Sequence, residues 1–151
     1  MIEFKDLNGN VVESKVEKLS FRPAVYGLVK KDKKYLVIKP CWDEKFSFVG
    51  GGLDCGEDFI EAIKREFLEE IGYEIKVLSD VPIFVNTSIY ADPKKDKYFQ
   101  RLNFYFEVEL VKENKSVLDK EVDKQIWLDE LKSEDFTYFQ QEFVNEVIKN
   151  G

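Results

Sequence analysis

Alternating and helical hydrophobic patterns divide the chain into predicted strands and two predicted helices. Strands are expected where runs of β-branched and aromatic residues lie between turn residues, at 2–13 (a hairpin), 25–29, 35–38, 46–49, 75–78, 81–89, 102–111 and 124–128. The hairpin is predicted to turn at Asn8 and Gly9, a dipeptide that readily adopts the positive φ values of a tight turn. The segments 25–29 and 35–38 are expected to pair with each other across a charged turn.

Two segments change to the helical period. Apolar side chains recur at steps of three and four in residues 58–71, which predicts an amphipathic helix that ends at Gly72. A C-terminal helix is predicted to begin with Ser133 as its N-cap, with an apolar stripe formed by Phe136, Phe139, Phe143 and Val147. The order of strands, helix, strands and helix predicts an α+β domain in which helices cover both faces of a mixed sheet.

The amino-acid composition excludes several classes of catalytic and binding site. The 151 residues contain no repeat or linker, so one domain over 1–151 is expected. The 30 acidic residues exceed the 23 basic ones, and the net charge of −7 argues against binding nucleic-acid polymers. The absence of histidine excludes imidazole acid–base chemistry and His-ligated zinc. Cys41 and Cys55 fit free thiols in the cytoplasm, and no apolar run is long enough for a membrane span.

The first predicted helix carries a group of acids. Glu66, Glu69 and Glu70 fall within an arc of about 100° beside the apolar stripe, where burial disfavours an ionised carboxylate. Three consecutive glycines at 50–52 precede the helix, and glycines let a backbone approach a ligand closely, although such a cluster also fits a plain turn. From these residues alone two interpretations stay open: an acidic face in solvent, or a site for a hard divalent cation with oxygen ligands.

Residues 51–73 resemble a complete Nudix box. The box reads Gly-x5-Glu-x7-Arg-Glu-U-x-Glu-Glu-x-Gly-U, where U is apolar, and its fixed polar and glycine positions are met by Gly51, Glu57, Arg65, Glu66, Glu69, Glu70 and Gly72. Tyr73 at the last U and Val49 before the glycines depart from the usual residues, but neither supplies a metal ligand. The resemblance extends over most of the chain and implies the Nudix fold, an α/β/α sandwich with a central mixed β-sheet.

The resemblance implies a hydrolase that cleaves a diphosphate linkage in a nucleoside diphosphate derivative with Mg2+ or Mn2+. The residues implied to be catalytic are Arg65, Glu66, Glu69 and Glu70, and likeness to the MutT-like branch favours Glu66 as the general base. The implied metal ligands are the Gly50 carbonyl, Glu66, Glu69, Glu70 and, from outside the box, Glu121, with Glu107 and Glu109 as rivals to Glu121. Structural or orienting roles are implied for Gly51, Glu57 and Gly72.

The resemblance leaves the substrate open among small-molecule nucleotides. The first choice is a nucleoside triphosphate cleaved to monophosphate and diphosphate. The alternatives are a dinucleoside polyphosphate, a nucleotide sugar or ADP-ribose, or a non-catalytic nucleotide sensor on the same fold. Candidate substrate-binding residues are Arg22 and Arg101 for phosphates and Trp42 and Tyr90 for the base, although each also fits an ordinary core or surface role. Because Nudix proteins are often dimers, a homodimer is a candidate assembly.

Overall fold

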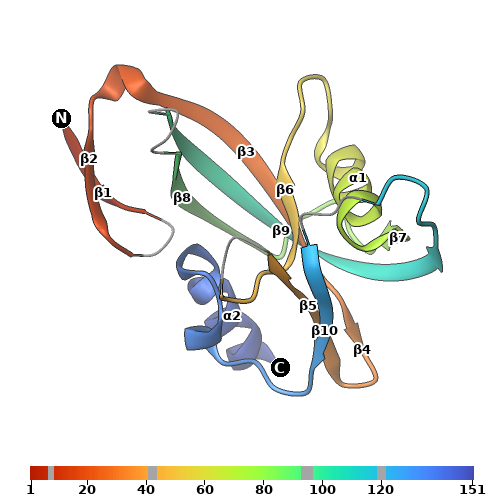
Figure 1. Ribbon diagram of the computed structural model, residues 1–151. Coiled ribbons are helices and arrows are strands. Elements are labelled where there is room, and N and C mark those ends of the chain that lie inside the picture. Colours follow the sequence, from red (N-terminus) through yellow and green to blue (C-terminus); the bar gives the residue numbers. More distant parts are fainter. Residues whose placement is uncertain (7–8, 41–43, 93–96, 119–121) are drawn as a thin grey trace.

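The computed structural model describes residues 1–6, 9–40, 44–92, 97–118 and 122–151. The strands labelled in Figure 1 are β1 (Ile2–Lys5), β2 (Val11–Ser14), β3 (Leu19–Leu28), β4 (Lys30–Lys31), β5 (Lys34–Pro40), β6 (Val49–Gly52), β7 (Tyr73–Val77), β8 (Phe84–Asp92), β9 (Lys97–Glu113) and β10 (Val122–Leu128). The helices are α1 (Phe59–Ile71) and α2 (Gln141–Asn150), with short 3₁₀ helices at Val16–Lys18, Ser133–Asp135 and Tyr138–Gln140. Within the described ranges, no helix has the length and apolar character that a membrane crossing requires.

A mixed five-stranded sheet forms the centre of the fold. Its order is β6-β3-β9-β7, and β8 pairs with the first half of β9. The central pair, β3 and β9, runs parallel, while every other pairing in this sheet is antiparallel. Besides β3, strand β9 pairs with two more strands because it is 17 residues long: β8 pairs with its residues 97–105 and β7 with its residues 108–113.

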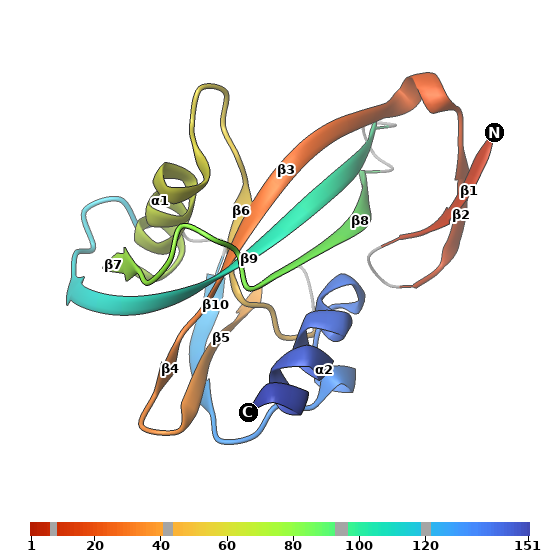
Figure 2. The same cartoon turned by 180° about the vertical axis from the view of Figure 1, so that it is seen from behind.

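The two helices pack on opposite faces of this sheet (Figures 1 and 2). Alternate side chains of a strand point to opposite faces, so β3 contributes to two cores. Val25 packs with Ile63 and Phe67 of α1, whereas Tyr26 belongs to the core that contains Phe143 of α2. The structure therefore confirms the predicted α+β class, with a mixed sheet between helical layers.

The N-terminal hairpin and helix α1 also match the sequence prediction. β1 and β2 pair antiparallel, and Gly9 has a φ of 83° in the turn between them, while Asn8, the other predicted turn residue, lies outside the described residues. Helix α1 begins after Asp58, whose side chain accepts a hydrogen bond from the Glu61 amide. It ends at Gly72, which adopts the left-handed conformation with a φ of 67°.

The predicted pairing of segments 25–29 and 35–38 is wrong. β3 pairs with β6 and β9, while β5 pairs with β4 and β10 in a separate three-stranded sheet. The two segments stay connected by one backbone hydrogen bond, from the Leu36 amide to the Val29 carbonyl at 3.0 Å. Because β3 is apolar on both faces, it fits the centre of the larger sheet better than one arm of a hairpin.

The C-terminal helix begins at Gln141 rather than after Ser133 as predicted. The backbone of residues 135–137 is drawn out of the helical path because it pairs with Phe46: the Phe46 amide donates to the Asp135 carbonyl and the Thr137 amide donates to the Phe46 carbonyl. Ser133 therefore starts only a short 3₁₀ helix, in which Lys132 occupies the N-cap position without a side-chain hydrogen bond. The predicted apolar stripe still reaches the core, where Phe136 and Phe143 are buried.

Close packing of α1 on the sheet depends on Gly27. A Cβ atom at this position would lie 2.5 Å from Cε2 of Phe67, whose side chain is fully buried. Gly27→Ala is therefore expected to lower the free energy of unfolding by about 1–3 kcal/mol, because neither the strand nor the ring has space to move.

Urea unfolding measures this effect, and Phe67→Leu supplies the matched partner. If the clash is the cause, the double variant loses less stability than the sum of the two single variants. Strict additivity would contradict the packing explanation.

Candidate functional site

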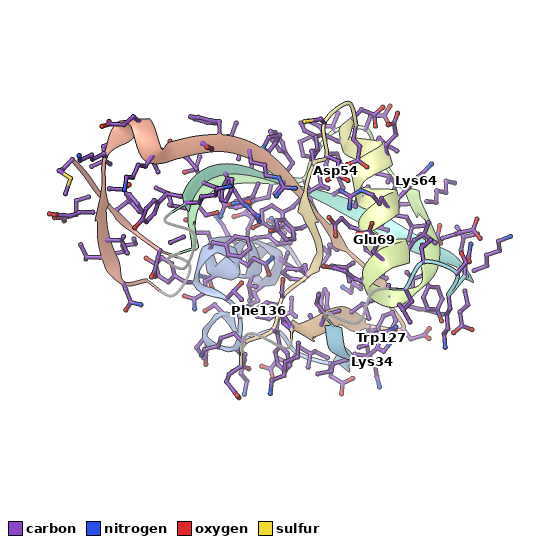
Figure 3. All side chains as sticks on the ribbon, turned by 45° about the horizontal axis from the view of Figure 1, so that its top comes forward. Lys34, Asp54, Lys64, Glu69, Trp127 and Phe136 are labelled. Carbon is purple, nitrogen blue, oxygen red and sulfur yellow. The ribbon has the colours of Figure 1, made fainter. Side chains whose placement is uncertain are left out.

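Helix α1 carries acidic side chains along the edge that faces β6 and the loop 53–57. Ala62, Ile63, Phe67 and Ile71 are buried against the sheet, which orients the remaining sides of the helix. Figure 3 shows Asp54 and Glu69 on the side of the helix next to the loop and Lys64 pointing away from it. The helical period that fills the core therefore also directs the acids toward the loop and β6.

The guanidinium of Arg65 lies at the centre of this group. Its Nε and Nη2 atoms donate to the two carboxylate oxygens of Glu57 at 2.7 and 3.0 Å, a forked arrangement that fits two planar groups. Its Nη1 atom donates to Glu66 at 3.1 Å and to Glu69 at 3.0 Å. The Nη2 atom also donates to the Gly52 carbonyl at 3.0 Å. One side chain thus joins the loop, strand β6 and helix α1.

These contacts shift the pKa values of the groups that make them. The hydrogen bonds from Arg65 hold the pKa of Glu57 below its usual range, and the carboxylate of Glu57 in turn raises the pKa of Arg65. Both groups are therefore charged at neutral pH. The Glu57 carboxylate also accepts a hydrogen bond of 2.7 Å from the Asp54 amide, which closes the loop on itself.

Glu66 is the buried acid of the group. Only 9% of its surface is exposed, and burial raises its pKa to about 6 despite the nearby Arg65. The carboxylate packs against Gly51: a Cβ atom on that glycine would lie 2.6 Å from Oε1 of Glu66. Gly51 therefore provides the space in which a charged group sits beside the backbone of β6.

Glu70 contacts the same strand one residue earlier. Its Oε2 atom accepts a hydrogen bond of 2.9 Å from the Gly50 amide. The glycines 50–52 belong to strand β6, where they pair with residues 24–26 of β3, so they do not form a bend. The carboxylates of Glu66 and Glu70 raise the pKa of the buried Tyr26, although burial is the larger cause.

Two arginines, Arg22 and Arg101, lie on the sheet face covered by α2. Arg22 of β3 donates from Nε to the Leu53 carbonyl at 3.3 Å, and its Nη2 atom lies 3.7 Å from the Asp54 carboxylate. Arg101 of β9 donates from Nη1 to the Tyr26 hydroxyl at 3.4 Å. Arg22 and Arg101 are direct neighbours in the parallel register, so Arg101 lies one strand farther from β6 than Arg22 does.

The remaining predicted site residues are not all near the cluster. Trp42, Glu121 and the Tyr90 side chain lie outside the described residues. Glu107 and Glu109 are exposed on β9, where Glu107 lines a cavity next to Phe143 of α2 and Glu109 pairs with Lys76 of β7. Asp54 and Tyr26 are not among the site residues predicted from the sequence. Asp54 could have been found as an acid inside the glycine-to-helix loop, whereas Tyr26 resembles any buried strand residue.

The cluster has an excess of negative charge. Asp54, Glu57, Glu66, Glu69 and Glu70 supply five carboxylates, against the guanidinium groups of Arg22 and Arg65. Among the described residues no three acidic, His or Cys side chains converge as a ready set of metal ligands. The contacts explain this, since Arg65 holds Glu66 and Glu69 while Glu70 binds the Gly50 amide.

The chain is similar to known Nudix proteins in both sequence and structure. A family model described as NUDIX domain matches residues 20–147. The nucleoside triphosphatase NudI of Escherichia coli (strain SE11) is 27% identical over 128 residues, which cover 78% of this chain and 86% of NudI. Similar solved structures include a NUDIX hydrolase from Nitrosomonas europaea, with a TM-score of 0.60, 22% identity and coverage of 85% of this chain and 90% of that one. A MutT NUDIX hydrolase from Burkholderia pseudomallei has a TM-score of 0.61, 18% identity and coverage of 85% and 98%.

Replacing Arg65 tests whether its fork holds the loop to the helix. A lysine keeps the charge but cannot contact Glu57 through two nitrogens while reaching the Gly52 carbonyl. Arg65→Lys is expected to lower the free energy of unfolding by about 1–3 kcal/mol, measured by urea unfolding. The neighbouring exposed residue supplies the control, since Lys64→Arg should change stability by less than about 0.5 kcal/mol. Equal urea midpoints for the Arg65 variant and the wild type would contradict the assigned role.

Proposed function

The chain belongs to the NUDIX domain family and is a hydrolase of acid anhydrides, and we propose that it uses Mg2+ to cleave a diphosphate linkage in a nucleoside triphosphate. The products are the nucleoside monophosphate and diphosphate. The observation that carries this proposal is the cluster of carboxylates that Arg65 gathers between α1 and β6. A cluster with this excess of negative charge suits a cationic cofactor and an anionic substrate that is bound through it.

The residues of the cluster fit a hard divalent cation such as Mg2+ or Mn2+. All their donor atoms are oxygens, which both ions prefer. Burial raises the pKa of Glu66 to about 6, so the ionised carboxylate is costly without further positive charge nearby. We propose that Glu66, Glu69, Glu70 and the Gly50 carbonyl hold the cation, with Glu121, outside the described residues, as an additional ligand. When bound, the cation supplies charge neutralisation of the diphosphate and acidification of the attacking water.

The side chains of this chain then bind and orient the substrate. Arg22 and Arg101 lie side by side on the sheet and suit the oxygens of the phosphate chain. Arg65 orients Glu66 and Glu69, and Glu66 is our candidate for accepting the proton of the attacking water. A bond forms between the water oxygen and phosphorus, and the bridging oxygen leaves with the electron pair of the broken P–O bond.

The choice of a nucleoside triphosphate rests on likeness to a relative. NudI is named a nucleoside triphosphatase, and the match extends over 78% of this chain. An ADP-ribose pyrophosphatase and a UDP-X diphosphatase share the fold at 13% and 18% identity, which supports the fold alone. A cytoplasmic location and a homodimer remain predictions from the sequence.

Amide variants of the proposed ligands test the site. Glu69→Gln and Glu70→Gln should each lower Mg2+-dependent kcat about 100-fold or more, because each removes a negative ligand whose contribution is worth several kcal/mol. Phosphate release from a panel of nucleoside triphosphates measures the effect. Glu61→Gln is the matched control, since Glu61 lies exposed in the first turn of the same helix. Unchanged turnover in both ligand variants would overturn the assignment.

The Glu66→Gln variant tests whether the Glu66 carboxylate is needed for activity rather than for the stability of the fold. Its activity should fall by a similar factor, whereas its thermal midpoint without metal at neutral pH should stay equal or rise. The raised pKa of Glu66 means that its ionised carboxylate destabilises the fold, and glutamine stays neutral. A large loss of stability would show that the fold needs the Glu66 carboxylate in its charged form.

A further inference from the structure

A cavity of about 420 Å³ lies at the opposite edge of the central sheet from β6. Phe4 and Lys5 of β1, together with Asp6, form one wall, and Ser88 of β8 lies on another. The helical segment 138–145 completes the lining. Figures 1 and 2 show the hairpin beyond the end of β8, with the start of the C-terminal helical segment below both.

The hairpin is attached to this cavity by aromatic contacts. The ring of Phe4 meets that of Tyr98 edge-on at 6.2 Å between centroids, and the Lys5 ammonium lies 5.9 Å from the centroid of the Tyr138 ring. A Cβ atom at Gly9 would lie 3.3 Å from the same Tyr138 ring, so the hairpin turn also packs closely there. The wall that the hairpin supplies is therefore part of the folded domain.

The lining suits a flat, uncharged ring with hydrogen-bonding groups. Phe4, Tyr138 and Phe139 offer aromatic surface, while Ser88 and Asn145 offer polar atoms. The Ser88 hydroxyl oxygen accepts a hydrogen bond of 2.9 Å from the buried Asn103 amide, which fixes its position and leaves its proton to donate. Lys5 is outnumbered in the lining by Asp6 and Glu142, so a phosphate group is disfavoured.

A single row of side chains connects the cavity to the acidic cluster. Arg22, Arg101 and Ser88 are neighbours in the register of β3, β9 and β8, and strand alternation places them on the same face of the sheet. Arg22 at one end of the row contacts the Asp54 carboxylate of the cluster. From β6 to β8 the sheet spans three strand spacings, about 14 Å, which suits an extended nucleotide.

We propose that this cavity binds the base of the substrate nucleotide, with the N-terminal hairpin as a determinant of base specificity. The proposal rests on the proposed function, because the phosphates must lie on the arginine row for the base to reach Ser88. It assigns a role to residues 2–14, which lie outside the segment that the NUDIX family model matches.

Filling the cavity tests the proposal without disturbing the carboxylates. Asn145→Trp places a large ring in the cavity from an exposed position of α2, and Phe4→Ala removes an aromatic wall. Lys149→Trp is the matched control, on the same helix but outside the lining. The kcat and KM are measured for the four deoxynucleoside triphosphates and for deoxyribose 5-triphosphate, which lacks a base.

We expect Asn145→Trp and Phe4→Ala to raise KM for the preferred nucleotide at least tenfold while kcat changes less than threefold. The two cavity variants should hydrolyse the base-free triphosphate with the kcat and KM of the wild type. The Lys149→Trp control should keep the wild-type kcat and KM for every substrate. If the variants leave KM unchanged for every nucleotide while Glu70→Gln still abolishes turnover, the base site is wrong and the proposed function stands. If Glu69→Gln and Glu70→Gln both leave turnover unchanged, the proposed function itself fails.

Calorimetric titration with the four deoxynucleoside monophosphates gives a second measurement that does not need turnover. The wild type should bind at least one of them, Asn145→Trp should weaken that binding at least tenfold, and Lys149→Trp should not. Equal affinities for the wild type and the cavity variants, or no binding by the wild type, would overturn the proposal.

Discussion

The site depends on one electrostatic constraint: several carboxylates have to lie close together beside a buried helix face. Such a group repels itself, and Glu66 is deep enough that burial raises its pKa. Arg65 offsets the repulsion, since it contacts Glu57, Glu66 and Glu69 and also binds the Gly52 carbonyl. The loop between β6 and α1 therefore closes around the positively charged guanidinium of Arg65.

Glycines make this arrangement sterically feasible, because each lies where a side chain would collide with a functional or packing group. Gly27 admits the Phe67 ring, which brings α1 close to the sheet. Gly51 then leaves space for the Glu66 carboxylate, and a Cβ atom at Gly52 would collide with the guanidinium of Arg22. In this structure, helix, strand and arginine approach one another where these glycines carry no side chain, so core packing and site geometry share one cause.

Elements that depend on neighbouring residues in the chain could be predicted from the sequence. Elements whose bounds or partners depend on distant segments could not. Helix α1 was predictable because its stripe, its cap Asp58 and its terminator Gly72 are neighbours in the chain. The start of α2 was not, because Phe46, some ninety residues earlier, pairs with the backbone at 135–137. The partners of β3 likewise depend on β9, and no short-range pattern marks a parallel pairing over that separation. For the same reason Tyr26 and its contact with Arg101 went unnoticed, whereas the spacing of the box glutamates was evident.

The acidic cluster and the cavity at β8 are therefore built in different ways, one from neighbouring residues and the other from distant segments. The carboxylates and their arginine come from one continuous stretch of chain, in which strand β6, the loop after it and helix α1 place them. The arginine row and the cavity at β8 draw on β3, β8, β9, α2 and the N-terminal hairpin, which meet only in the folded domain. A change in the hairpin can therefore alter the far wall of the cavity while Arg65 and its carboxylates keep their contacts. Under the two proposed assignments, the cluster that cleaves the bond and the cavity that selects the base can therefore vary separately.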